Sequence, residues 1–464
     1  MGRARARMSA TLTFLGATGT VTGSKFLLDV AEHRTLVDCG LYQGAKELRL
    51  RNWEPLPIAA GSVDDVVLTH AHIDHAGYLP RLCLDGFHGA IHVTHATADL
   101  LPIMLADSGH LQEEEAEYHN LRGTSKHHPA LPLYTAAEGL RAAGRVTGRS
   151  YGDRVRLQDD LSVEFAPAGH IIGAATLTVD VRTAAGHRRV VFSGDLGRYG
   201  APIMPDPTPI GDADYIVVES TYGDRAHDPT PVADQLERVL IETAAREGAI
   251  VIPAFAVGRT QEIMYHLTQL ERAGRIPKIP CYIDSPMAMR ATDVYRAHPD
   301  ELDGDTQALV ESHRFRITAT AAESRGIHAV PGPLIIIAGS GMVTGGRVLH
   351  HLRARLRDPR TTVLLVGYQA LGTRGRSLAD GAASVRIFGE DVPVRAQVVT
   401  IHGLSAHADQ PGLLRWLRTA RRAPRGVFVV HGEPGPAAAL AERVSRDLGW
   451  RVTVPGYRDC APLE

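Results

Sequence analysis

The stretch VVLTHAHIDHAGYLP, residues 66–80, decides the fold, because it sets three histidines and an aspartate directly after an apolar run. The run Val66-Val67-Leu68 is typical of a buried strand, and Gly77 and Pro80 indicate turns after it. A rigid strand holds the side chains at its end in place, while the following loop exposes them. The stretch therefore predicts a site for chemistry at a strand end.

The spacing of the polar residues in this stretch favours metal binding. His70 and His72 stand two residues apart, and on a strand end or tight turn this spacing points both rings toward one point. Asp74 and His75 follow at once and can serve a second, neighbouring ion. Imidazoles with a few carboxylates suit Zn²⁺, with Mn²⁺ or Fe as alternatives, and the lack of cysteine ligands disfavours a purely structural zinc. The alternative is a histidine-rich surface loop, which the buried run just before the cluster disfavours.

Length and composition bound the class of protein. With 464 residues the chain is long enough for two or three domains, and 44% hydrophobic with 22% charged residues is typical of a soluble globular protein. It contains no run of about 18 apolar residues, which argues against a membrane span, and no membrane partner is expected. The N-terminal MGRARARMSA is basic without an apolar segment behind it, which argues against a secretory signal.

Cysteine spacing and net charge bear on the redox compartment of the protein and on its binding partners. The four cysteines lie far apart with no CxxC pair, which favours reduced thiols and a cytoplasmic location over a disulfide framework. The 50 basic and 52 acidic residues nearly cancel, so bulk charge does not indicate a nucleic-acid partner. Any site for a polyanion has to be local.

The pattern along the chain predicts one domain interrupted by another. Residues 11–38 read as short strands with glycine turns, which favours an antiparallel or mixed sheet, and strand-like runs near 215, 249, 334 and 362 alternate with helical segments, which favours a parallel sheet. Histidine-bearing strand ends return after about residue 396. The expected divisions are a disordered basic tail at 1–10, a first domain at 11–207 and 396–464, and an inserted α/β domain at 208–395.

The ordered set of motifs resembles the metallo-β-lactamase superfamily. HAHIDH resembles its metal motif, and three further motifs match as Asp38 in LVDCG, His170 in PAGHIIGAA and Asp195 in FSGDLG. The inserted block resembles the β-CASP branch, which processes nucleic acids and includes bacterial relatives of the pre-mRNA 3′-end processing endonuclease subunit. Its motifs match as Glu219 in VVESTYGD, His407 in GLSAHAD and His431 in VVHGEP.

The resemblance covers nearly the whole chain after the first ten residues. It implies an αββα sandwich with an inserted α/β β-CASP domain. The chain departs from the family pattern at Ile73, where leucine is common, and at Ala174, where serine often follows the glycine. Neither departure falls on a ligand.

The resemblance also implies roles for individual residues. Two Zn²⁺ ions, or alternatively Mn²⁺, are expected, one held by His70, His72 and His170 and the other by Asp74, His75 and His431. Asp195 is expected to bridge them and Asp38 to accept a ring N–H from a ligand imidazole. The expected catalytic residues are His407, Glu219, Asp195 and Asp74. By analogy with the family's inserted domain, the expected phosphate contacts are Arg259, Gly341, Thr344, Arg376, His402 and Ser405.

These assignments predict a two-metal ribonuclease. Two divalent ions exceed the charge of two ligand carboxylates, so the site attracts an anionic phosphodiester and holds an activated water near neutral pH. His407 is the expected general acid, because a nearby carboxylate such as Glu219 favours imidazolium. Endonucleolytic cleavage of single-stranded RNA, in RNA processing or decay, is the expected function. A hydrolase of a thioester or lactone and a non-catalytic RNA-binding protein are the alternatives, and the oligomeric state, with a homodimer as one alternative, stays open.

Overall fold

The structure is a computed structural model that describes residues 10–184, 186–303 and 315–464, except for the side chain of His402. Apart from Ala10, the expected basic tail lies outside these residues. The chain divides into two compact units, the first formed by the residues up to 226 and from 407 onward, the second by residues 227–406. The expected limits near 208 and 395 differ from this division: they place residues 208–226 in the inserted domain and residues 396–406 in the first domain.

The first unit is a sandwich of two sheets, each with seven strands among the described residues. In spatial order the first sheet contains β22 (Cys460–Pro462), β1 (Ala10–Phe14), β2 (Phe26–Val30), β3 (His33–Val37), β4 (Asp65–Val67), β5 (Ala90–Thr94) and β6 (Val146–Arg149). The second contains β21 (Val452–Thr453), β20 (Gly426–Val430), β11 (Tyr215–Glu219), β10 (Gly186–Phe192), β9 (Ala175–Thr183), β8 (Leu161–Pro167) and β7 (Arg154–Gln158).

Apolar side chains from both sheets form the core between them. Phe14, Phe165, Phe192 and Phe428 are buried there with valines and leucines of the neighbouring strands. A fully buried phenylalanine side chain contributes about 1.5–3 kcal/mol relative to exposure, so this layer accounts for much of the stability of the unit. The alternation of buried and less buried residues in β1 and β8 follows the two faces of a strand, one of which points into this core.

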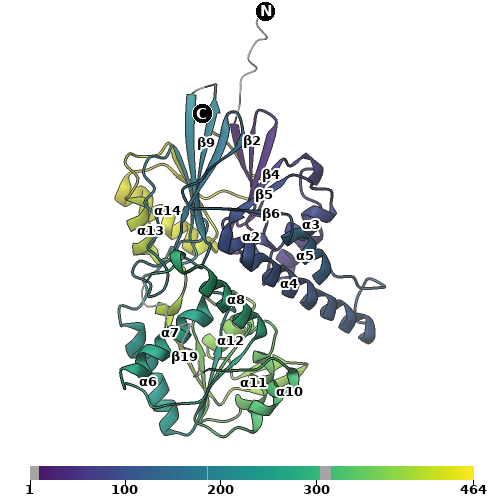
Figure 1. Cartoon of the computed structure of the whole chain (residues 1–464), viewed down its shortest axis with the longest axis vertical. Coiled ribbons are helices and arrows are strands. Elements are labelled where there is room, and N and C mark those ends of the chain that lie inside the picture. The colour runs from purple at the N-terminus through teal and green to yellow at the C-terminus, as the bar shows by residue number, and fades with distance from the viewer. Residues whose placement is uncertain (1–9, 185, 304–314) are drawn as a thin grey trace, which may run out of the picture. The chain divides into compact units, whose positions relative to one another are not determined.

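Helices cover the outer faces of both sheets (Figure 1). Beside the first sheet lie α3 (Leu79–Leu84), α4 (His95–Arg122) and α5 (Ala136–Ala143), and α13 (Gln410–Leu417) and α14 (Pro434–Leu448) pack on the second. Two short helices, α1 (Lys46–Leu50) and α2 (Ile73–Ala76), lie in the loops after β3 and β4. The four layers confirm the expected αββα sandwich.

The second unit is built on a parallel six-stranded sheet, counted over the described residues. Its spatial order is β14 (Phe315–Ile317), β13 (Cys281–Asp284), β15 (Leu334–Ala338), β12 (Ala249–Pro253), β16 (Thr362–Leu365) and β19 (Gln397–Thr400). Its helices include α6 (Val232–Ala245), α7 (Arg259–Arg272), α8 (Pro286–Ala297), α10 (Ala321–Gly326), α11 (Val348–Arg355) and α12 (Arg374–Ala379), and β17 (Ser384–Ile387) pairs with β18 (Glu390–Pro393). The strands β12, β13, β15 and β16 are fully buried, as parallel strands covered on both faces are. This unit confirms the expected inserted α/β domain.

No helix among the residues that the structure describes is both long and apolar enough to cross a membrane.

Candidate metal centre

Strand direction brings the histidine and carboxylate motifs of the first unit to one edge. β10 pairs in parallel with β11 and β11 with β20, while β8 and β10 both run antiparallel to β9. β8, β10, β11 and β20 therefore run in the same direction, and their carboxyl ends meet at one edge of the sheet. His170, Asp195 and His431 follow three of these ends, and Glu219 is the last residue of the fourth.

One group of ligand atoms contains His70, His72, His170 and Asp195, with each pair of atoms within 4.8 Å. The Nδ1 atom of His72 lies 3.1 Å from Nε2 of His70 and 3.2 Å from Nε2 of His170. Oδ2 of Asp195 lies 3.5 Å from Nε2 of His70 and 3.6 Å from Nε2 of His170. Three ring nitrogens and one carboxylate oxygen thus converge on one point.

A second group contains Asp74, His75, Asp195 and His431. Nε2 of His75 lies 3.2 Å from Nε2 of His431 and 3.2 Å from Oδ1 of Asp195, and Nε2 of His431 lies 3.3 Å from Oδ2 of Asp74. Asp195 therefore offers Oδ2 to the first group and Oδ1 to the second. All seven expected ligands come together, and the arrangement has the shared carboxylate that the sequence predicts.

The spacing of these atoms fits divalent cations. Zn²⁺ takes nitrogen and oxygen ligands at about 2.0–2.2 Å in a tetrahedral arrangement, which separates the ligand atoms by roughly 3.3–3.6 Å. The separations of 3.1–3.6 Å in the first group agree with this geometry, and those of 3.2–3.8 Å in the second are close to it. Oδ1 of Asp195 is buried without a hydrogen-bond partner in the described part of the chain, which a cation would relieve. The residues therefore fit a metal centre.

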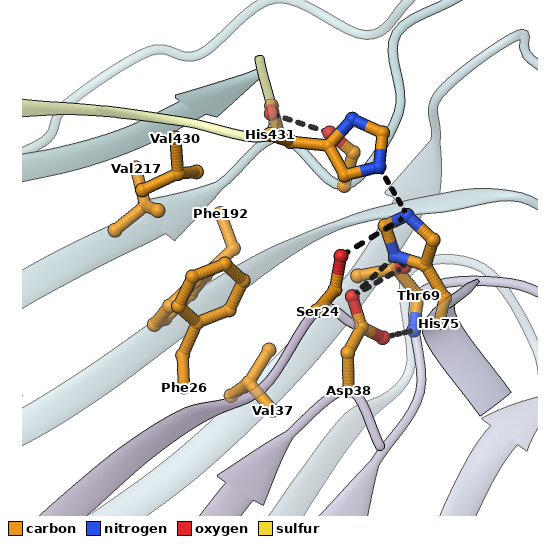
Figure 2. A pocket seen from close by; sticks show the side chains of 12 residues that line it. Ser24, Phe26, Val37, Asp38, Thr69, His75, Phe192, Val217, Val430 and His431 are labelled. Atoms are coloured by element: carbon orange, nitrogen blue, oxygen red, sulfur yellow. Dashed lines mark hydrogen bonds and ion pairs between the residues drawn. The ribbon is translucent and has the colours of Figure 1, made fainter. Parts of the chain in front are cut away.

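Asp38 and Thr69 orient His75 through its Nδ1 atom, on the side of the ring away from the ligand atom Nε2. Oδ2 of Asp38 lies 2.8 Å from Nδ1 of His75, and its two oxygens also accept the Thr69 N–H at 2.7 Å and the Thr69 hydroxyl at 3.0 Å. A proton on Nδ1 leaves the Nε2 lone pair of His75 facing the other ligands. Figure 2 shows this network on one side of a cavity of about 10 Å³, close to the space that one water molecule needs. The lining on the other side is apolar, with Phe26, Val37, Phe192, Val217 and Val430.

Burial sets the protonation of the first group. It lowers the pKa of His72 to about 4, and it lowers the pKa of His70 and of His170 well below the ordinary value of 6.5. These rings are neutral near pH 7, so their lone pairs are available to a cation. Burial also lowers the pKa of His75, but the carboxylates of Asp195 and Asp38 outweigh it and raise that pKa well above the ordinary value, so a cation at Nε2 has to displace a proton there.

His407 and Glu219 form a pair beside the first group. Nδ1 of His407 lies 3.0 Å and 3.1 Å from the two oxygens of Glu219, whose side chain is fully buried and also accepts the Leu196 N–H at 2.7 Å. Burial lowers the pKa of His407, but Glu219 and Asp195 outweigh it and raise the pKa to about 9. Nε2 of His407 lies 3.9 Å from Oδ2 of Asp195, so the ring holds a proton near the metal centre.

Residues 19–253 match the sequence profile described as the metallo-beta-lactamase superfamily, and a curated relative is 38% identical over nearly its whole length. The chain belongs to this superfamily. Within this metallo-β-lactamase chain, residues 260–378 match the Beta-Casp domain and residues 391–455 match the Zn-dependent metallo-hydrolase RNA specificity domain. The expected family is confirmed.

The relatives carry names from RNA metabolism. A ribonuclease of Thermus thermophilus is 38% identical over 457 residues, which cover 97% of this chain and 99% of the relative. The transcription termination factor FttA of Methanosarcina mazei is 31% identical over 94% of this chain and 69% of its own length. A crystal structure of an Enterococcus faecalis protein superposes with a TM-score of 0.55 at 13% identity, over 98% of this chain and all of that one, which is a likeness of fold alone.

The expected phosphate contacts lie in the second unit, residues 227–406, and differ in accessibility. Arg259 is buried and its guanidinium donates to Glu262 one turn along α7, and Ser405 is buried as well. Arg376 is on α12, where its Nε donates to both oxygens of Asp380 at 2.9 Å. The side chain of His402 lies outside the described residues. The contribution of these residues to phosphate binding stays a prediction, and the ion pair of Arg259 within its own helix does not favour it.

The glycine-rich loop at 338–346, which holds Gly341 and Thr344, is fixed by the segment 369–375. Its carbonyl groups accept hydrogen bonds at 3.0 Å (Gln369 Nε2 to Gly341 O), 3.1 Å (Gly375 N to Met342 O), 3.4 Å (Arg374 to Val343 O) and 3.1 Å (Arg374 to Thr344 O). A Cβ atom at Gly341 would lie 2.6 Å from the Phe255 ring, which explains the glycine there. The loop is also tied internally, because the N–H groups of Ser340, Val343, Thr344 and Gly345 donate to acceptors within it.

The sequence interpretation missed several residues that support the metal centre. Thr69 bonds Asp38 and also lies 3.0 Å, through its hydroxyl, from Nδ1 of His70. The hydroxyl of Thr221 lies 3.2 Å from Nδ1 of His431. Thr69 directly precedes HAHIDH and Thr221 lies within VVESTYGD, so a polar residue in or next to a motif was the available signal. Lys25 had no such signal.

Proposed function

We propose that this protein is a metal-dependent ribonuclease that hydrolyses phosphodiester bonds of single-stranded RNA with two divalent cations, Zn²⁺ first and Mn²⁺ as the alternative. The observation that carries the proposal is the shared Asp195, which offers one oxygen to each of two ligand groups beside a histidine–carboxylate pair. The 38% identity to a ribonuclease over nearly the full length supports RNA as the substrate.

The metal ligands are proposed as the two groups that share Asp195. His70, His72 and His170 would hold one cation and Asp74, His75 and His431 the other, with Asp195 common to both. When bound, the pair of cations supplies positive charge for the phosphate and an activated water as nucleophile. Asp38 supports the second group because its carboxylate fixes the Nδ1–H tautomer of His75.

The proton for the leaving oxygen is assigned to His407. Glu219 holds the Nδ1–H of this ring, so Nε2 carries the proton that is transferred. A hydrolase of a thioester or lactone shares the metal ligands but needs neither this pair nor an inserted β-CASP domain. The pair therefore favours the nuclease over the rival hydrolase.

Further parts of the proposal concern the RNA contacts and the setting. The loop at 338–346 is proposed to meet a backbone phosphate through N–H groups other than those of Ser340, Val343, Thr344 and Gly345, which donate hydrogen bonds within the loop. We further propose endonucleolytic action and a cytoplasmic location. The four cysteines are free thiols, which agrees with a reducing compartment.

The decisive test is cleavage of a long single-stranded RNA whose 5′ end is structured and blocked, with Zn²⁺ or Mn²⁺ added. We expect internal fragments from the wild type, none after chelation and none from a His70→Ala, His72→Ala double variant. A His127→Ala, His128→Ala double variant is the matched control, because both of these histidines are exposed and lie outside the metal centre. Cleavage that resists chelation or survives in the first double variant would refute the proposal, and products only from an unblocked 5′ end would refute the endonucleolytic mode.

A further inference from the structure

Lys25 is a buried cation without a carboxylate partner. Its side chain is 2% exposed, and its Nζ donates to the carbonyl of Gly40 and lies 4.9 Å and 4.7 Å from the ring centroids of Tyr42 and Tyr78. No ion pair joins Lys25 to an acidic group in the part of the chain that the structure describes. Burial lowers its pKa to about 8. Because a buried ammonium group is costly, its position calls for a function.

The Gly40 carbonyl that accepts from Lys25 belongs to residues 39–41, and this segment forms backbone hydrogen bonds with the turn at residues 73–75. The contacts are made by backbone groups, so they fix the path of the turn more than any one side chain. The hydrogen bonds are Cys39 N to His75 O at 2.7 Å, Leu41 N to Ile73 O at 2.9 Å, Gly40 N to Ser24 O at 2.9 Å and Ser24 N to Asp74 O at 2.9 Å. Together with Lys25 they tie three stretches of chain into one clamp.

The approach of the two backbones is close at Gly40. A Cβ atom there would lie 1.6 Å from the carbonyl oxygen of Asp74, so the contact needs a glycine. A glycine has no side chain with which to fix its own position. The bond from Lys25 Nζ to the Gly40 carbonyl supplies that anchor, and the rings of Tyr42 and Tyr78 provide cation–π stabilisation for the ammonium group.

The clamp acts on one of the two ligand groups. The turn at 73–75 carries Asp74 and His75, which belong to the group with His431. The group with His70 and His170 is supported elsewhere, for example by the Thr69 hydroxyl on His70. We infer that Lys25 is a positioning residue for the cation held by Asp74, His75 and His431, through its bond to Gly40. This inference rests on the two-cation centre proposed above.

Metal titration of Lys25→Met tests the inference. The purified apoprotein is titrated with Zn²⁺ in competition with a chromophoric chelator, and bound zinc is measured by elemental analysis. Loss of an outer-shell partner typically weakens metal binding about 10–100-fold, so one equivalent of zinc is expected to bind that much more weakly while the other keeps its wild-type affinity. Lys46→Met, at an exposed lysine of α1, is the matched control and is expected to bind as the wild type does.

Two ligand-deficient backgrounds assign the weakened equivalent. In His72→Ala, the remaining ion is the one near the clamp, and adding Lys25→Met is expected to weaken it. In His431→Ala, the remaining ion is the other one, and adding Lys25→Met is expected to change nothing. Lys25→Gln keeps a side-chain N–H donor for the Gly40 carbonyl and is expected to lose less affinity than Lys25→Met.

Apoprotein measurements separate positioning from loss of the fold. Replacing an unpaired buried charge by methionine is expected to leave the apo Tm unchanged or higher. Hydrogen exchange is expected to quicken at the amides of residues 73–78 and not in the rest of the first unit. Equal weakening of both ions, wild-type affinity for both ions in Lys25→Met, or a large fall in the apo Tm would each overturn the inference. A wild-type protein that binds fewer than two ions would overturn the proposed function itself, and the inference with it.

Discussion

Asp38→Asn is expected to disable one half of the metal centre by changing the tautomer of a histidine. The Asp38 carboxylate is buried and accepts the Thr69 N–H on Oδ1 and the Nδ1–H of His75 on Oδ2, at 2.7 Å and 2.8 Å. In the asparagine variant the Thr69 N–H still needs an acceptor, so the amide oxygen of the new side chain takes the place of Oδ1. The amide NH₂ group then faces Nδ1 of His75, which becomes an acceptor, and the proton moves to Nε2.

The cost follows from the position of that proton. Nε2 of His75 lies 3.2 Å from both His431 Nε2 and Asp195 Oδ1, so a proton there blocks the lone pair that a cation needs. To bind the cation, the variant has to return the proton to Nδ1 of His75, where this N–H then faces the N–H of the new amide. The hydrogen bond from Nδ1–H to the charged carboxylate is lost as well, and such a bond contributes about 1.5–3 kcal/mol. At about 1.4 kcal/mol per tenfold change, the cation held with Asp74 and His431 is expected to bind about 10–100-fold more weakly.

Zinc titration against a chromophoric chelator at fixed pH measures this effect. Asp65→Asn is a suitable control, because Asp65 is also buried and lies 2.7 Å from a histidine nitrogen, that of His33, but outside the ligand groups. We expect one weakened equivalent in Asp38→Asn and two wild-type equivalents in Asp65→Asn. Unchanged binding in Asp38→Asn, or an equal loss in both variants, would refute the tautomer argument.

Three further outcomes are expected. His407→Ala should lower the rate constant for RNA cleavage by about 10²–10⁴-fold, the usual contribution of a general acid, with bound metal unchanged by elemental analysis; lost metal would contradict its assignment. Burial raises the pKa of Asp284, but hydrogen bonds from His351 and its neighbours outweigh it and hold that pKa well below 3.8. The stability that this ionised carboxylate contributes is present above the unfolded pKa of about 3.9 and is lost as pH falls below it. Asp284→Asn should therefore lower the free energy of unfolding by about 3–5 kcal/mol at pH 7 and by less near pH 3. Urea denaturation at the two pH values measures this difference. Gly197→Ala should lower zinc affinity and Tm, because its Cβ would lie 2.0 Å from the Gly169 carbonyl beside His170; an unchanged Tm in calorimetry would count against this.

The sequence predicted the architecture because each signal was local. The apolar runs of β11, β12 and β15 are buried on both faces and carry few polar residues, so they read directly as parallel strands of an α/β arrangement. The short strands β1, β2 and β3 pair antiparallel in chain order, as predicted; the glycines lie between β1 and β2, whereas Ala31 and Glu32 join β2 to β3 with positive φ angles. The limits of the inserted domain were harder to predict from the sequence. The two compact units meet after residues 226 and 406, within segments that have no compositional change.

The sequence by itself determined which side chains can carry the chemistry: the histidines and carboxylates that follow buried strands, in an order that matches a known family. The family resemblance gave their combination as an expectation only, and the tertiary structure decided its geometry. The two oxygens of Asp195 are divided between two groups, and His431 meets His75 at 3.2 Å across 356 residues of chain, which no local pattern can encode. The same holds for Lys25, whose importance depends on a glycine carbonyl 15 residues away and on a backbone contact to a third segment. Chemical identity is a property of single residues, whereas positioning depends on packing between segments distant in the chain.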